Sequence, residues 1–140
     1  MNLSKKIALS VAVGFFSNFA FAQTLQDGVD NADSHKYAKA KEVFTQMIAK
    51  SPTSENYFYL GNAYLTQFEP NFELAQENFN KGLAADKKSN LNKIGLASAK
   101  LGKGDKSGLA EIQNIVKDAR DKDAEVLYRA AEALTLFGGA

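Results

Sequence analysis

The feature that most constrains the fold is a nine-residue segment, Tyr57 to Leu65, in which large apolar residues surround Gly61. Altered copies lie around Gly95 and Ala131, so the pattern returns about every 35 residues. In an exposed helix, glycine would cost about 1 kcal/mol relative to alanine. A minimal side chain inside an apolar helical stripe therefore indicates that a second helix packs closely at that point. Helical units of this period predict a stack of helical hairpins.

The second helix of each predicted hairpin repeats with the same period. Its apolar residues share one helical face, because most of them recur at every fourth position. The two clearer copies are Tyr37, Ala40, Phe44 and Ile48, and Phe72, Ala75, Phe79 and Leu83. A weaker third copy consists of Gly108, Ile112 and Val116. The small residues of these copies match the small residues of the first helices, as expected for helices that approach closely.

Six polar or helix-breaking stretches divide the chain into segments with helical spacing. Sustained strand-like alternation is absent from all of these segments. Ser54, Ser89 and Asp123 are expected to cap helix N-termini, because their side chains can accept hydrogen bonds from free backbone amides. The predicted breaks lie at residues 33–36, 51–54, 69–71, 86–89, 102–105 and 121–123.

These residues resemble the tetratricopeptide repeat family. The resemblance rests on the motifs Tyr57-x-x-Leu60-Gly61-x-x-Tyr64, Phe72-x-x-Ala75-x-x-x-Phe79-x-x-Gly82-Leu83 and Tyr37-x-x-Ala40-x-x-x-Phe44. It implies an all-α fold, a right-handed α-solenoid of antiparallel helix hairpins. Residues 23–140 would form about three repeats and one terminal helix. That last helix is either an atypical cap or half of an interrupted repeat. We favour the second interpretation, in which the natural protein continues beyond Ala140.

The first 22 residues are typical of a secretory signal peptide. Lys5 and Lys6 precede an apolar run over residues 7–21, and Ala20-Phe21-Ala22 is a small-x-small cleavage signal. We expect cleavage after Ala22; the alternative is an uncleaved membrane anchor. The chain has no cysteine, which excludes disulfides and a lipid anchor on cysteine. The sequence therefore predicts an exported protein, periplasmic or secreted.

Charge and composition argue against binding of nucleic acid, an anionic membrane surface, zinc or phosphate. Loss of Lys5 and Lys6 leaves 15 of the 17 basic residues against 16 acidic residues, a net charge of −1. This balance favours neither nucleic acid nor an anionic membrane surface. His35 is the only histidine, so a histidine cluster for zinc is impossible. The stretch 102–108 lacks the spacing of a phosphate-binding loop. We therefore predict no enzymatic activity, no cofactor and no metal.

The resemblance implies that the first helix of each unit lines a concave binding face. Phe58 and Tyr128 would be its aromatic anchors, although Phe58 could instead pack against a neighbouring helix. Asn62 would hydrogen-bond an extended peptide backbone, unless it is a solvated surface residue. Some family members grip a terminal carboxylate with lysine, arginine and asparagine. We do not predict that mode, because no arginine lies near Asn62 in the expected groove. The predicted groove residues are Glu55, Phe58, Asn62, Leu65, Asn92, Leu96, Tyr128 and Glu132.

The resulting functional hypothesis is a non-catalytic scaffold in the cell envelope that holds a protein or peptide on its concave face. No nucleic acid and no stable membrane insertion after signal cleavage are expected. The alternative is a structural N-terminal segment of a longer repeat protein whose function lies downstream.

Overall fold

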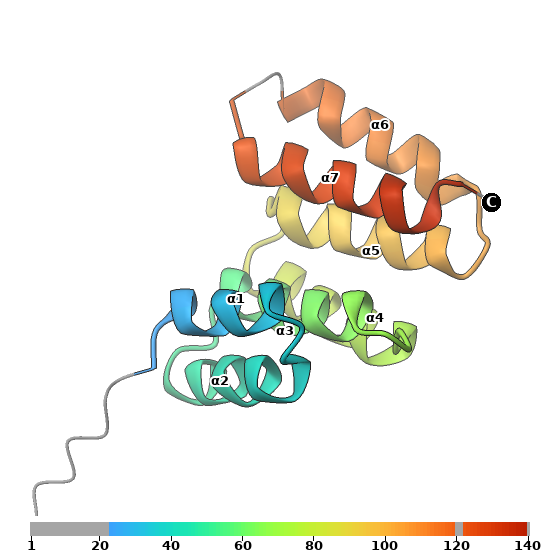
Figure 1. The fold of residues 1–140 in the computed structure, drawn as a ribbon. Coiled ribbons are helices and arrows are strands. Elements are labelled where there is room, and N and C mark those ends of the chain that lie inside the picture. The colour runs from blue at the N-terminus through green and yellow to red at the C-terminus, as the bar shows by residue number, and fades with distance from the viewer. Residues whose placement is uncertain (1–22, 120–121, 140) are drawn as a thin grey trace, which may run out of the picture.

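The computed structural model describes residues 23–119 and 122–139, so the predicted signal peptide lies outside the described residues. Over these ranges all regular secondary structure is helical, which confirms the all-α prediction (Figure 1). The seven helices are α1 (Leu25–Asp33), α2 (Tyr37–Lys50), α3 (Ser54–Thr66), α4 (Phe72–Ala85), α5 (Asn90–Gly102), α6 (Ser107–Ala119) and α7 (Ala124–Phe137).

Polar side chains start the helices close to the predicted positions. Ser89 accepts a hydrogen bond from the Asn92 amide at 3.3 Å, and Asp123 accepts one from the Val126 amide at 3.2 Å. The prediction for Ser54 was wrong by one residue. Thr53 caps α3, because its extended backbone directs the hydroxyl toward the amide of Asn56.

Each helix packs against the next one along the chain, and α1, α3, α5 and α7 also contact one another in order. Figure 1 shows α5, α6 and α7 as one group above the group formed by α1 to α4. Short connections between consecutive helices favour this local packing. None of the helices within residues 23–119 and 122–139 is long and apolar enough to cross a membrane.

The predicted notches are real contact points between helices. Phe79 of α4 is fully buried, and its ring lies against both Gly61 of α3 and Gly95 of α5. One large side chain therefore fills the notches of two consecutive units. Ala40 and Ala75, the predicted small partners on α2 and α4, are also fully buried. This alternation of large and small residues lets three helices approach one another closely.

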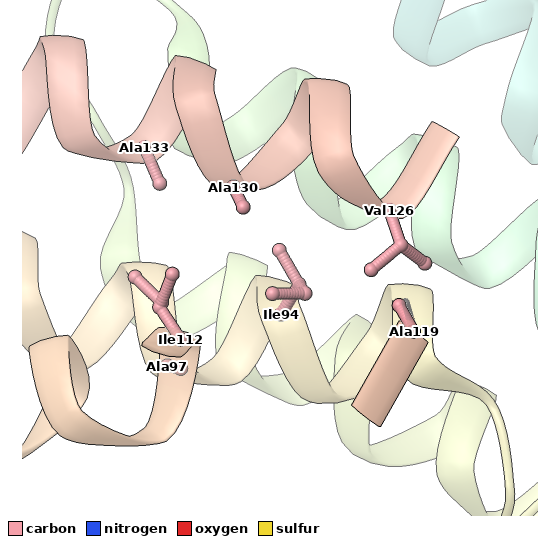
Figure 2. Packing of buried hydrophobic residues seen from close by; sticks show 7 residues of the cluster. All are labelled: Ile94, Ala97, Ile112, Ala119, Val126, Ala130 and Ala133. Carbon is pink, nitrogen blue, oxygen red and sulfur yellow. The ribbon is translucent and has the colours of Figure 1, made fainter. Parts of the chain in front are cut away.

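A separate apolar cluster joins α5, α6 and α7. It contains smaller side chains than the cluster around Phe79. In Figure 2, Val126 and Ala130 of α7 face Ile94 of α5, and Ala133 of α7 lies opposite Ile112. Ile112 of α6 completes the contact from the second helix of the unit. The cluster places one face of α7 in the core and leaves the rest of the helix available to form a surface.

The notch at Gly61 predicts an unusual response to alanine. A Cβ atom at Gly61 would lie 2.6 Å from Cε1 of Phe79. We expect Gly61→Ala to lower the free energy of unfolding by roughly 1–2 kcal/mol, because overpacking outweighs the gain of about 1 kcal/mol in helix propensity. Urea denaturation measures the difference. Gly139→Ala is the control, since no other atom lies within 4 Å of a Cβ there. A Gly61→Ala variant as stable as the parent would contradict the close contact.

Candidate functional site

A groove of about 530 Å³ lies between the N-terminal helices and α7, with α3 at its base. This volume falls in the range of ligand-binding pockets. One wall comes from α1 and from the turn into α2, and the opposite wall comes from α7. The side chains are aromatic, polar and charged in a mixed pattern. The lining residues central to the site are Asp33, His35, Tyr37, Tyr59, Asn62, Tyr128, Arg129 and Glu132.

The groove brings together three of the predicted site residues, Asn62, Tyr128 and Glu132. Asn62 is half-buried on α3, and its backbone carbonyl accepts a hydrogen bond from Thr66. Tyr128 is 54% exposed, which leaves much of its ring available to a partner. Glu132 lies one turn further along α7 and is partly shielded from solvent. Together these three side chains can offer a partner both apolar contact and hydrogen bonds, as protein-binding surfaces do.

Phe58 and Leu65 do not face the groove as predicted. Both are buried, because α5 packs against the side of α3 that carries them. The ring of Phe58 lies 5.9 Å from that of Phe79, centroid to centroid. The alternative for Phe58, packing against a neighbouring helix, therefore holds.

Asn92, Leu96 and Glu55 also lie outside the groove. Asn92 is fully buried, and its Nδ2 donates to the carbonyl and hydroxyl oxygens of Ser54 at 3.0 and 2.9 Å. It therefore joins the starts of α3 and α5. Leu96 lines a separate hollow between α5 and α6. Glu55 is exposed at the start of α3 and is not among the groove-lining residues.

Arg129 is one of the groove residues that sequence reasoning missed. It is only 8% exposed, although it carries a charge. Its Nε donates to Glu125 at 2.8 Å and its Nη1 donates to Glu132 at 3.1 Å. Burial opposes the charged form, but Glu132 and Glu125 outweigh burial and raise the pKa of Arg129. The guanidinium therefore stays charged and is held by two carboxylates.

Arg129 also connects α7 to the base of the groove. Its guanidinium carbon lies 4.9 Å from the ring centroid of Tyr128, 5.7 Å from that of Tyr59 and 5.8 Å from that of Phe58. These are distances for cation–π attraction. The Tyr59 hydroxyl donates to Glu125 at 3.3 Å. Burial, with a contribution from Glu125, raises the pKa of Tyr59, so the phenol remains a neutral donor.

An aromatic cluster stands at the opposite rim of the groove. His35 has a positive φ of 58°, and its Nδ1 lies 3.1 Å from the hydroxyl oxygen of Tyr37. Phe68, in the turn between α3 and α4, is 86% exposed and lies about 6 Å from both rings. His35 is exposed and belongs to the groove wall.

No protein-family model, curated protein or solved structure matches this chain. The function of the groove is therefore inferred from its own side chains. Within residues 23–119 and 122–139, no three histidine, cysteine, aspartate or glutamate side chains gather as a metal-binding group.

The sequence does contain a signal for Arg129. Arg129 lies between the core positions Val126 and Ala133. Glu125 precedes it by four residues, and Glu132 follows it by three. A charged residue on an apolar stripe, flanked at these spacings by opposite charges, indicates an internal ion-pair group on a helix. Tyr59 could not be found in this way, because its exposure depends on how α7 lies relative to α3.

Proposed function

We propose that this protein is a non-catalytic binding module that holds a peptide segment of a partner protein in the groove between α1 and α7. The observation that carries the proposal is the groove itself, lined by exposed Tyr128, half-buried Asn62 and the rings at the α1–α2 turn. Aromatic side chains supply large contact areas at low entropic cost, and an asparagine amide can pair with both donors and acceptors of a backbone.

The proposed architecture is a right-handed solenoid of tetratricopeptide-like hairpins. It is supported by the contacts between consecutive helices and by the ordered contacts among α1, α3, α5 and α7. The repeat architecture is also supported by Phe79, which is buried against two glycines that lie 34 residues apart, close to the repeat period. In such an array the first helices of the units line the concave face. The groove would then be the concave face of a short array.

The proposed location is the cell envelope or the exterior. This part of the proposal rests on the signal-like residues 1–22 and on the lack of cysteine. N-terminal sequencing of the exported protein should give Gln23 as the first residue. An exported product that retains Met1 would contradict cleavage.

Peptide binding is tested with the isotope-labelled full-length chain and a pool of capped heptapeptides of random sequence. We expect amide resonances of groove-lining residues to shift, and Asn62→Ala and Tyr128→Ala to weaken the titration about tenfold or more. Asn114→Ala and Leu109→Ala are the matched controls, because both residues are exposed on α6 outside the groove. Equal loss in the controls, or shifts confined to other surfaces, would contradict the proposal.

A second candidate function, a structural segment of a longer repeat array, is favoured by two exposed residues of α7, Ala131, which also lines the groove, and Leu134. Gly61 is buried against Phe79 of α4, whereas the matching Ala131 of α7 is exposed. Leu134, three residues further on, is also exposed. A further helix would cover these two residues as α4 covers α3. Reading the coding sequence beyond Ala140 tests this candidate: a helix with the spacing of α4 would support it, and a stop codon would contradict it.

A further inference from the structure

We propose that the groove recognises a lysine or arginine side chain of the bound peptide. This inference rests on the proposed peptide-binding function and specifies the chemistry of the partner. The cation would lie between the acidic side chains of the two walls, Asp33 at the end of α1 and Glu132 on α7. It would contact the aromatic rings that line the same space.

The charges that face the groove favour a cation. Arg129 is the one lysine or arginine among the described residues that line it. Its guanidinium is already held by Glu125 and Glu132, which together carry one negative charge more than it neutralises. Asp33 adds a further negative charge at the opposite wall. Asp33 is exposed, and Glu125 and Glu132 are partly exposed, so this imbalance attracts a cation within the groove and weakens as the salt concentration rises.

The same charges disfavour a carboxylate ligand. Sequence reasoning rejected carboxylate recognition because no arginine was expected nearby, and that premise was wrong, since Arg129 lines the groove. The rejection still follows from the structure for a different reason. A ligand carboxylate bound to Arg129 would lie close to Glu125 and Glu132, which already pair with it, and would also face Asp33.

The aromatic side chains provide the second element of a cation site. The groove already holds one guanidinium against the rings of Tyr128 and Tyr59, which shows that its geometry accommodates a cation on aromatic faces. Tyr128 remains 54% exposed in spite of that contact. On the other wall, Tyr37 lines the groove, and the exposed ring of Phe68 lies beside it, edge to face, with ring centroids 6.2 Å apart. The methylene groups of lysine or arginine can pack along such rings while the charged end reaches a carboxylate.

The test compares four pools of capped heptapeptides with random flanks and a fixed central residue: lysine, arginine, norleucine or glutamate. Norleucine keeps the aliphatic chain of lysine without its charge. We expect the lysine and arginine pools to bind the full-length chain about tenfold more tightly than the norleucine pool, from one cation–π contact and one or two ion pairs. The glutamate pool should bind most weakly. Higher ionic strength should reduce the preference.

Variants of the two acidic residues test whether the preference for a central lysine arises from the carboxylates on the two walls. Asp33→Asn should reduce it, and Asp33→Asn with Glu132→Gln should bring the lysine and norleucine pools within about twofold of each other. If Glu132→Gln disturbs the position of Arg129, the single variant Asp33→Asn still tests the inference. Glu77→Gln is the matched control, since Glu77 is an exposed carboxylate on α4 that pairs with Lys81.

The outcomes separate this inference from the proposed function. A norleucine pool that binds as tightly as the lysine pool, with binding lost in Tyr128→Ala, would overturn cation recognition and leave peptide binding supported. A lysine preference that persists in the double variant would place the cation elsewhere and would also overturn the inference. Absence of binding by all four pools would overturn both proposals.

Discussion

Replacing Phe79 with alanine is expected to lower the free energy of unfolding by about 3–5 kcal/mol. Phe79 is fully buried and forms the contact between α3, α4 and α5. The cavity left by its ring would be bordered by Gly61 and Gly95, which have no side chains that could move into it. Relaxation is therefore limited, and the loss should fall near the upper end of the range. Since domains of this size are stable by about 5–15 kcal/mol, the variant would lose a large part of its stability.

Phe68→Ala is the matched control for Phe79→Ala. It removes the same atoms from an exposed position in the turn between α3 and α4. We expect it to change stability by less than about 0.5 kcal/mol. Urea denaturation of both variants, followed by far-ultraviolet circular dichroism, measures the difference. If the two variants unfold at the same urea concentration, then Phe79 does not hold the three helices together as described.

The helices and their contacts were largely predictable because the information is local. The period of 35 residues aligned Phe44 with Phe79 and Ala40 with Ala75, and all four side chains are buried. A residue such as Gly61, which is unfavourable in an exposed helix, could be interpreted only by close packing. The turn residues likewise predicted helix ends to within a few positions. These inferences needed only neighbouring residues along the chain and the geometry of one helix.

The groove was less predictable because it depends on how helices far apart in the sequence lie relative to one another. Asn62, Tyr128 and Glu132 line the groove, and all three lie off the predicted packing stripe of their own helices. Phe58 also lies off that stripe, but α5 covers it, and the angle between α3 and α5 is not a local property of the sequence. Position along one helix therefore did not show which residues a neighbouring helix covers, since Phe58 and Asn92 are buried whereas Tyr128 is exposed.

Replacing Arg129 with alanine is expected to cost roughly 2–3 kcal/mol of stability, below the 3–5 kcal/mol typical of a fully buried ion pair. The value is reduced because Glu125 and Glu132 are both partly exposed and can be hydrated when their partner is lost. The loss combines two causes. The variant removes the contacts of the guanidinium with the rings of Tyr59 and Tyr128, and it leaves the two carboxylates close together without a counter-charge.

Two further variants separate these causes. Lys81→Ala breaks an exposed ion pair between residues four apart on α4, and it should cost less than about 0.5 kcal/mol. Arg129→Met combined with Glu125→Gln and Glu132→Gln removes all three charges while keeping most of the volume. This triple variant should recover much of the stability lost in Arg129→Ala, because no unpaired carboxylate remains. Urea denaturation measures all of these differences.

The position of Arg129 makes its stability effect relevant to binding. It lies on α7, whereas Tyr59 belongs to α3, so the contact between them fixes one wall of the groove to its base. We therefore expect Arg129→Ala to broaden the amide resonances of groove residues on α7 before global unfolding occurs. The triple variant should hold the wall more firmly than Arg129→Ala, because no unpaired carboxylate remains. Its preference for a central lysine should be reduced but not lost, since Asp33 stays on the opposite wall. An Arg129→Ala variant as stable as Lys81→Ala would contradict the role of this ion-pair group in joining α7 to α3.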